Sequence, residues 1–480
     1  MQAVLNGITS AFGFISDMGS AVMVPLFIFL IGLFFRLGVI KSLRSALVVG
    51  AGFIGMGLVF NIIWTYMIPI SDNLRDKFGF NRPYYDVGGG GAGVVAFGTE
   101  VGMYIIPFII ILNVVLLLLK VTKTINIDIW NFWHLAFTGS VVVVLSELAG
   151  ASHTEAIIYG LIGAAAHSIL ALLLADMTAK RVQEEFGMPG VSISQGFATS
   201  SVPLFLLLDK LYDFIAPKSK GEGKKAKKAP TGIMALFAEP IVIGFILGIG
   251  LGLLGANYEE GAKVVIQTVL MLGVQLGALM LLLPRMIKII VEGLLPVSDA
   301  VRTFVNKRYP GREFYIGLDS AVLLGHPNTL IVSVLLIPIL IVLSVILPWN
   351  TTLPLADLAA TAFFVSMATP IHRGSFWKTL VSGTIIFAIV LTLSSFFGPM
   401  ITTAAGPAGF AIPDGANGIT ALSAGNMFAW VIAMVLQLKV FGVLILAAII
   451  VAVIFFINKV AYKLYDWVPS PADKAAAKKD

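Results

Sequence analysis

Long apolar runs recur along almost the entire chain, and they limit the fold more than any other feature of the sequence. Gly102–Leu119 and Val332–Leu347 are two examples, each close to the roughly 20 residues that a helix needs to cross a bilayer. Only 12% of the residues are charged, against about 25% in a soluble domain. The runs lack the alternation of a barrel strand, so helices must be the spanning elements. We expect an all-α polytopic membrane protein.

The expected spans follow from the length and apolar character of each run. They lie at 17–36, 45–68, 101–119, 133–150, 155–176, 235–255, 331–348, 354–370, 379–397 and 435–458. The segments 197–213 and 263–284 are apolar enough to cross but are ambiguous. The sequence therefore predicts about 11 transmembrane helices.

Lys and Arg in short loops predict the orientation, because such residues are retained on the cytoplasmic side. They follow the first span, fill an amphipathic connector at 285–312 and recur in the tail. We expect the N-terminus outside and the C-terminus in the cytoplasm of a bacterial inner membrane. The lysine-rich linker 217–230 conflicts with this arrangement. Either 197–213 does not cross, or the linker lies outside and 263–284 does not cross.

Weak internal similarity indicates a duplication. SDMGSAVMVPLFIFL at Ser16–Leu30 parallels SQGFATSSVPLFLLL at Ser194–Leu208, and the run at 102–119 parallels that at 332–347. The polar segment at Asp128, between two apolar runs, has a counterpart at Asp357. The orientation makes the two halves inverted, which is typical of transporters with interrupted helices near the midplane. We therefore expect two re-entrant hairpins, near 86–100 and 317–329, to form the substrate site.

The first hairpin, DVGGGGAGVVAFGTEVG, carries Asp86 and Glu100. Its successive glycines allow a tight turn and the close approach of a ligand. A carboxylate at membrane depth is costly unless it is paired or hydrated. We predict that Asp86 and Glu100 contact the substrate; in the alternative interpretation Glu100 only begins a helix in an external loop.

The second hairpin, GLDSAVLLGHPNTL, carries Asp319 and His326. Pro327 ends any helix at His326, because the residue before proline avoids helical angles. Capping explains Asn328 and the threonine after it, but it does not explain Asp319 or His326. We predict that both bind the substrate.

Two further polar residues begin apolar segments. His134 lies in NIDIWNFWHLAFTGS, about one turn inside a span, and a neutral imidazole both donates and accepts hydrogen bonds. Gln195 lies in VSISQGFATSS beside a glycine. We predict that both bind hydroxyl groups, as in a polyol. The alternatives are a buried structural histidine and a polar helix cap.

The sequence also excludes several functions. It contains no cysteine, so disulfides and thiolate metal sites are excluded. No Walker motif, kinase signature or HExxH zinc motif is present, and we expect no cofactor and no metal. The net charge of +6 is typical of cytoplasmic loops in a membrane protein, and we expect no nucleic-acid partner.

Several motifs resemble a known family. TKTINIDIWNFWHLAFTG, EFYIGLDSAVLLGH, LLLPRMIKIIVEGL and PIHRGSFWKTLVSG are similar to the galactitol-family enzyme IIC. This enzyme IIC is the membrane permease component of the bacterial phosphoenolpyruvate:sugar phosphotransferase system, in the ascorbate/galactitol superfamily. The similarity covers nearly the whole chain in order. The chain departs from the galactitol pattern at Gly89, Gly90, Glu100 and Gln195.

The resemblance implies a fold with two inverted repeats. It predicts a core domain that carries two re-entrant hairpins and slides as an elevator against a scaffold domain that forms a homodimer. The expected parts are scaffold at 1–85, core at 86–190, scaffold at 191–312, core at 313–470, and a disordered basic tail at 471–480.

The resemblance also implies the function and the partners. The substrate is galactitol or a related polyol or sugar, which crosses the inner membrane and is phosphorylated by a separate cytoplasmic enzyme IIB. That enzyme carries the phosphoryl group on a cysteine and receives it through enzyme IIA, so the absence of cysteine in this chain fits. The chain itself binds and transports the substrate and is surrounded by membrane lipid. The binding residues lie near Glu100, His134, Gln195, Asp319 and His326. The alternative is an ion-coupled secondary transporter for a polyol or sugar acid.

Overall fold

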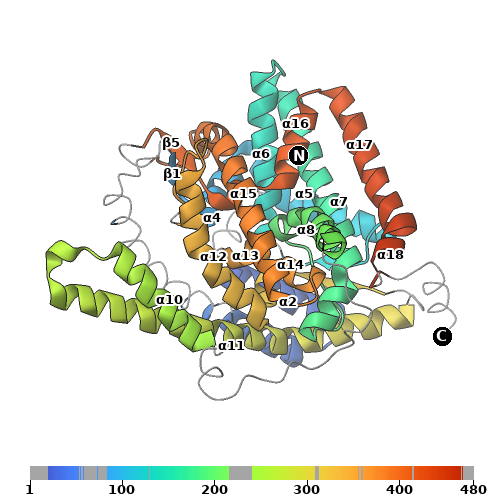
Figure 1. Cartoon of the computed structure of the whole chain (residues 1–480). Coiled ribbons are helices and arrows are strands. Elements are labelled where there is room, and N and C mark those ends of the chain that lie inside the picture. Colours follow the sequence, from blue (N-terminus) through green and yellow to red (C-terminus); the bar gives the residue numbers. More distant parts are fainter. Residues whose placement is uncertain are drawn as a thin grey trace.

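A computed structural model shows a protein built mostly of helices (Figure 1). The structure describes residues 20–52, 54–55, 58, 73, 84–128, 130–215, 240–308, 313–354, 356–357, 361–412, 416–465 and 467–468. The expected span at 45–68, the lysine-rich linker at 217–230 and the tail at 471–480 lie wholly or largely outside these residues.

The helices follow the expected apolar runs closely, because burial and lipid contact both favour them there. The helices of the first half are α2 Ser20–Phe34, α4 Gly88–Gly98, α5 Glu100–Leu118, α6 Trp133–Leu148, α7 His153–Phe186 and α8 Gly196–Ile215. Those of the second half are α10 Pro240–Gly255, α11 Ala262–Arg308, α12 Pro327–Ile346, α13 Thr361–Val365, α14 Ala368–Ile371, α15 Phe376–Ala405, α16 Met427–Leu436, α17 Val440–Phe455 and α18 Ala461–Leu464. Short 3-10 helices form at η1 Trp130–Phe132, η2 Tyr258–Glu260, η3 Ser320–Gly325 and η5 Leu422–Ala424, and a π-helical turn, η6, at Phe456–Val460.

Several of these helices are long and apolar enough to cross a bilayer. Among the described residues there are four, namely His153–Phe186, Pro327–Ile346, Phe376–Ala405 and Val440–Leu464. The bent pair α4 and α5 makes a fifth if it is counted as one span. Shorter apolar helices, α6 among them, accompany these spans. The architecture is that of a helical membrane protein, and the count of about 11 spans stays a prediction.

Five short strands, absent from the all-α expectation, form two small parallel sheets. In the first sheet β1 Tyr84–Asp86 pairs with β5 Gly418–Thr420, and Tyr84 also bridges Thr352. In the second sheet β4 Tyr315–Leu318 lies between β2 Thr124–Asn126 and β3 Val191–Ile193. Each sheet therefore joins segments that are far apart in the sequence.

The glycine-rich stretch after Asp86 is helical, where the sequence analysis expected a tight turn. α4 contains the glycines, and the chain turns only at its end, where α4 and α5 meet at an angle of 97°. This angle is typical of a broken span or a re-entrant loop. The Thr99 hydroxyl caps α5 through the Gly102 N–H and contacts the Ser140 hydroxyl of α6 at 2.8 Å. A Cβ at Gly102 would lie 2.0 Å from the Ala96 carbonyl oxygen, so the bend requires glycine there.

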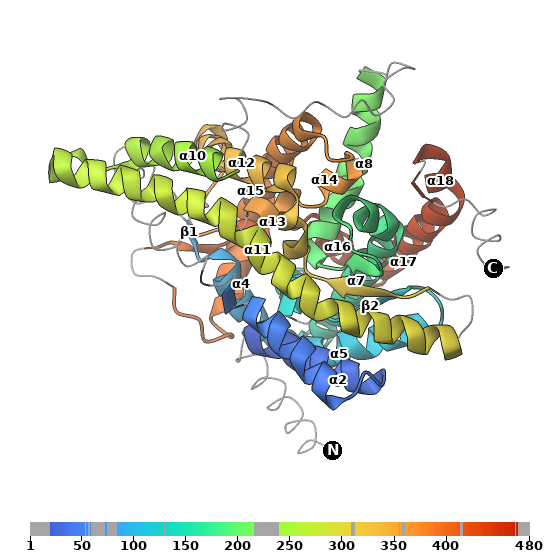
Figure 2. The same cartoon turned by 90° about the horizontal axis from the view of Figure 1, so that it is seen from below.

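α11 is a single continuous helix of 47 residues that contains both the ambiguous segment 263–284 and the expected connector 285–312 up to Arg308. It pairs with α10 as a hairpin that projects from one side of the molecule (Figure 1). Seen from below, α11 crosses the whole face of the helical bundle, with α2 against its second half (Figure 2). α11 and α2 thus form an outer layer. The helical bundle that they cover carries the two sheets.

Candidate functional site

The second sheet brings three polar segments to one edge. Because its strands are parallel, the residues that follow β2, β4 and β3 meet at the carboxyl ends of the strands. The Ser194 hydroxyl donates to Asn126 at 2.9 Å, and the Ser320 hydroxyl donates to Gln195 Oε1 at 2.5 Å. Gln195 and Ser320 are both buried. The structure therefore brings the predicted residue Gln195 beside the start of the second predicted hairpin.

Two carboxylates lie at the same edge. Asp319 caps η3 through the Ala321 N–H at 3.0 Å. Asp128 accepts from the Asn131 side-chain amide at 2.9 and 3.1 Å, and that amide also bonds Asp319. The two carboxylates are close enough to interact electrostatically. Asn131 thus lies between two acidic groups whose remaining lone pairs can accept from a polyhydroxylated ligand.

His134 borders this edge from α6. A Cβ on Gly196 would lie 3.1 Å from the His134 Cβ, so the imidazole stands next to the start of α8. Its ring stacks on Trp133 at a centroid distance of 3.8 Å and is 3% exposed. Among the described residues its Nδ1 has no hydrogen-bond partner. Because an unpaired buried nitrogen costs about 1–3 kcal/mol, this atom is a candidate ligand contact.

His167 is a buried structural histidine, which was the alternative interpretation of His134. Its Nε2 bonds the Gly196 carbonyl at 2.9 Å and its Nδ1 bonds the Thr138 hydroxyl at 2.7 Å. Asn426, which caps α16, donates to the same Gly196 carbonyl. His167 thus ties α7 to α6 and α8 and has both ring nitrogens occupied.

The first sheet carries a second carboxylate pair with different partners. Asp86 accepts from the backbone N–H groups of Gly88, Ala356 and Asp357 at 3.1, 2.8 and 3.2 Å. Asp357 accepts from Gly89 N–H at 2.7 Å and from the N–H and hydroxyl of Ser423, both at 2.8 Å. Each carboxylate thus binds the backbone of the other's segment. The predicted residue Asp86 is therefore apart from Gln195 and Asp319.

Glu100 and His326 also lie in other surroundings. Glu100 is exposed, and its carboxylate contacts His153 Nε2 at 2.8 Å. His326 caps α12 through Asn328 N–H and faces Glu185 of α7 at 3.4 Å. Of the six predicted residues, Gln195 and Asp319 meet through Ser320, and His134 borders them at Gly196, whereas Asp86, Glu100 and His326 are held by other partners. Substrate contacts for all six stay predictions.

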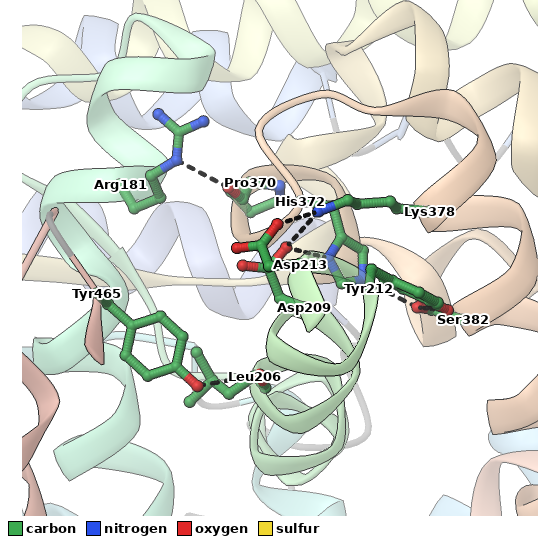
Figure 3. A network of polar contacts seen from close by, with 10 residues as sticks. All are labelled: Arg181, Leu206, Asp209, Tyr212, Asp213, Pro370, His372, Lys378, Ser382 and Tyr465. Carbon is green, nitrogen blue, oxygen red and sulfur yellow. Dashed lines mark hydrogen bonds and ion pairs between the residues drawn. The ribbon is translucent and has the colours of Figure 1, made fainter. Parts of the chain in front are cut away.

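A third polar cluster joins α8 to α14 and α15 (Figure 3). His372 bonds Asp209 through Nδ1 at 3.1 Å and the Ser382 hydroxyl through Nε2 at 2.9 Å. Lys378 pairs with Asp209 and Asp213 at 3.3 and 3.0 Å. Burial lowers the pKa of His372, although its bond to Asp209 opposes the shift. The cluster therefore contains a neutral histidine at neutral pH.

Sequence reasoning missed several members of these clusters. It weighed neither His372 and Lys378 nor Asn131 and Ser320 as functional residues. One signal was available for the third cluster, since Asp209 and Asp213 lie one helical turn apart in an otherwise apolar segment. Within the described residues, no group of three or more His, Asp or Glu side chains is placed to hold a metal ion.

Interrupted helices, small parallel sheets and a buried edge rich in hydrogen-bonding groups define a membrane permease for a polar solute. The family model for sugar-specific permease components of the PTS system, EIIC-GAT, matches residues 14–416. The chain therefore belongs to this family, and its general role is that of a sugar-specific permease component in a membrane. Such components work with EIIB and EIIA proteins and a sugar substrate.

Two relatives from Escherichia coli (strain K12) match almost end to end. A protein named as a permease IIC component is 43% identical over 448 residues, covering 93% of this chain and 99% of the relative. A galactitol-specific EIIC component is 32% identical over 447 residues, covering 92% of this chain and 94% of the relative. The resemblance inferred from the motifs is thus confirmed.

Proposed function

We propose that this chain binds a hexitol-like polyol or a related sugar at the carboxyl edge of the second sheet and delivers it to the cytoplasm for phosphorylation by EIIB. The observation that carries the proposal is the meeting of Asp319, Gln195 and His134 at one buried edge, with His134 Nδ1 unpaired among the described residues.

The chemistry of this edge suits hydroxyl groups. A polyol loses water when it enters a buried site, and each hydroxyl left unpaired costs about 1–3 kcal/mol. Asp319 and Asp128 offer carboxyl oxygens as acceptors, and the hydrogen bonds are stronger where the acceptor is charged. Asn131, Gln195 and a neutral His134 both donate and accept. This mixture matches a ligand whose hydroxyls do both.

The galactitol-specific relative supports a hexitol-like substrate class. Gln195, one of the departures from the galactitol pattern, accepts from Ser320 through its side chain. This substitution alters the donors and acceptors that face the ligand, so we propose the class and not galactitol itself.

Release follows from the charge added by phosphorylation. A phosphate ester carries close to two negative charges near neutral pH. Asp128 and Asp319 lie at the proposed site and would repel it. Phosphorylation by EIIB thus makes the inward step effectively irreversible, without an ion gradient.

We also propose that the two halves are inverted repeats. In the first sheet β1 comes from the first half, and it pairs with β5 and bridges Thr352, both of the second half. In the second sheet the central strand, β4, comes from the second half and its neighbours from the first. Asp86 and Asp319 occupy equivalent positions, since each accepts the N–H two residues later. The pairing of strands from one half with strands from the other, in both sheets, supports a duplication.

The same proposal divides the chain into a core that carries both sheets and a scaffold that includes α2, α10 and α11. Residues 191–215 belong to the core in this division, because β3 pairs with β4 and α8 packs on α7. We propose that the core slides against the scaffold as an elevator, that the scaffold forms a homodimer, and that the C-terminus is cytoplasmic. Light scattering of the purified protein tests the dimer.

Transport in reconstituted vesicles tests the function. Vesicles that contain this chain alone should not accumulate free hexitol against its gradient, whereas adding EIIB, EIIA and the phosphoryl donor should give sugar phosphate inside. Accumulation driven by a Na⁺ or H⁺ gradient without the donor would contradict the proposal and favour an ion-coupled transporter. A binding screen of hexitols, pentitols and related sugars on the purified protein then identifies the substrate.

A further inference from the structure

A cavity of about 1280 Å³ opens between the end of α2 and the second half of α11, away from both sheets. One wall is the segment 35–48, which is helical from residue 39, and the other is 292–307 of α11. Four basic side chains line it, namely Arg36, Lys41, Arg44 and Lys307. Two acidic side chains, Glu292 and Asp299, share the wall, so the cavity has an excess of positive charge.

The four cations are available to a ligand. All four are exposed, and within the described part of the chain none of them takes part in an ion pair. Positive charges gathered in a concave surface raise the local potential and attract anions. The cavity is thus suited to a compact anionic group and is not neutralised by its own carboxylates.

The apolar residues around the cavity indicate what carries that anionic group. Phe35 and Phe304 meet edge to face at 5.2 Å in the cavity wall. Lys41, Arg44 and Val48 face the cavity at helical spacing. One position earlier on the same helix, a second stripe is solvent-facing, with exposed fractions of 85% for Ile40, 48% for Leu43 and 64% for Leu47.

The two stripes together match an amphiphile. A free phosphate ion would use the basic stripe and leave the apolar stripe uncovered. A phospholipid uses both, because its headgroup phosphate can bind the basic cavity while its acyl chains run along the apolar stripe. The position also fits, since α2 and α11 form the outer layer of a membrane protein (Figure 2).

We propose that this cavity binds the phosphate-bearing headgroup of an anionic phospholipid, with the acyl chains against Ile40, Leu43 and Leu47. Arg44 and Lys307, which approach from opposite walls, hold the phosphate. Glu292 and Asp299 oppose binding and tune its strength. The site is independent of the sugar site, and it makes the contact between α2 and α11 sensitive to the lipid around the protein.

Lipid binding to the purified full-length chain tests the proposal by native mass spectrometry. Titration with phosphatidylglycerol and, separately, with phosphatidylcholine should show tighter binding of the anionic lipid. The double variant Arg44→Gln/Lys307→Gln should lower phosphatidylglycerol affinity about 30-fold, because each basic residue near an anionic lipid contributes roughly a five-fold factor. Phosphatidylcholine affinity should fall much less, because its choline cation offsets the charge of its phosphate in a basic cavity.

Two controls sharpen the test. Lys263→Gln removes one positive charge from the exposed start of α11, outside the cavity, and should leave phosphatidylglycerol binding unchanged. Glu292→Gln removes a negative charge from the cavity and should strengthen binding about five-fold. If the double variant is poorly produced, the stronger binding expected of Glu292→Gln still tests the proposal.

Three results would overturn the proposal. The first is equal affinity of the wild type for the two lipids. The second is full competition by inorganic phosphate at concentrations similar to those of the lipid, which would assign the cavity to a free anion. The third is a change from dimer to monomer in Ile40→Asn with phosphatidylglycerol binding intact, which would assign the apolar stripe to a second copy of the chain.

Discussion

Each of the two sheets has a pair of carboxylates beside its strands, and the two pairs differ in their hydrogen-bond partners. In the first sheet, Asp86 and Asp357 each accept three hydrogen bonds from nearby backbone or serine groups, so their acceptor capacity is largely used. In the second sheet, Asp319 accepts from the Ala321 N–H at 3.0 Å, from the Ser320 hydroxyl at 3.5 Å and from the Asn131 amide that it shares with Asp128. Backbone groups thus supply most partners of the first pair, whereas side chains supply most partners of the second, and we propose that these side chains can turn to a ligand.

The difference shows how one construction serves two roles. A parallel edge always gathers the residues that follow its strands, so each of the two sheets has a polar cluster of its own. Backbone N–H groups from the neighbouring segment complete one cluster. The other is completed by side-chain amides, a hydroxyl and an imidazole that can exchange their partners for a sugar. The predictions below test this division.

The largest expected effect is on stability, from Asp357→Ala. Removing this carboxylate leaves the half-buried N–H of Gly89 and the buried N–H of Ser423 without their acceptor, at about 3–5 kcal/mol in total. The melting temperature in detergent should fall strongly, while the folded fraction should bind hexitol with unchanged affinity. Ser423→Ala removes only one hydroxyl bond and should cost about 1 kcal/mol. A stable Asp357→Ala protein with weakened sugar binding would contradict this division, because it would assign the first sheet to sugar binding and not to stability.

Next in size is the loss of affinity in Asp319→Asn. Asparagine can still cap η3, because it is among the favoured capping residues, so the melting temperature should change little. Loss of the charged acceptor should weaken hexitol binding roughly 10- to 100-fold, as measured by calorimetry. Asp357→Asn is the matched control and should mainly lower stability. If Asp319→Asn binds hexitol as the wild type does, the second sheet is not the sugar site.

A smaller effect is expected from His134→Phe. Phenylalanine keeps a flat ring against Trp133 but removes Nδ1, the unpaired nitrogen. Hexitol affinity should fall about five-fold, the value of one neutral hydrogen bond. His167→Phe is the matched control and should reduce stability, because both ring nitrogens of His167 are bonded. Unchanged affinity in His134→Phe would remove His134 from the site.

The smallest expected effect is on the pH dependence of stability, and it concerns the third cluster and not the two sheets. Burial lowers the pKa of His372 below that of the unfolded chain. The unfolded state therefore takes up a proton first as the pH falls, so stability is complete above the ordinary histidine pKa and declines below it. The melting temperature should fall more between about pH 7.5 and 5.5 in the wild type than in His372→Gln. Equal slopes would show that the pKa of His372 in the folded protein is not lowered relative to the unfolded chain.

The sequence predicted most helices because apolar runs bury or contact lipid wherever they fall. α6 at Trp133–Leu148 matches the expected 133–150 closely. The span expected at 435–458 is present as Val440–Leu464 but begins five residues later, because the chain turns between α16 and α17, where Lys439 adopts a φ of 53°. The glycines after Asp86 were misread as a turn, because neighbours pack against α4 and outweigh the weak helix propensity of glycine.

The site was predicted only in part, for a different reason. Polar residues in apolar surroundings stand out in a sequence, which selected Asp319, Gln195 and His134. Their partners did not stand out, because the Ser320–Gln195 bond joins residues 125 positions apart. The same holds for Asp86, whose partner Asp357 is 271 positions away. Only the pairing of distant strands reveals which carboxylate is already satisfied.

The most direct test of the account is a structure of the protein with its hexitol bound. The account predicts the sugar at the carboxyl edge of the second sheet, with its hydroxyls in hydrogen-bonding contact with Asp319, Gln195 and His134. The hydrogen bonds of Asp86 and Asp357 should be the same as without the sugar. A sugar bound at the first sheet, or apart from both sheets, would contradict it.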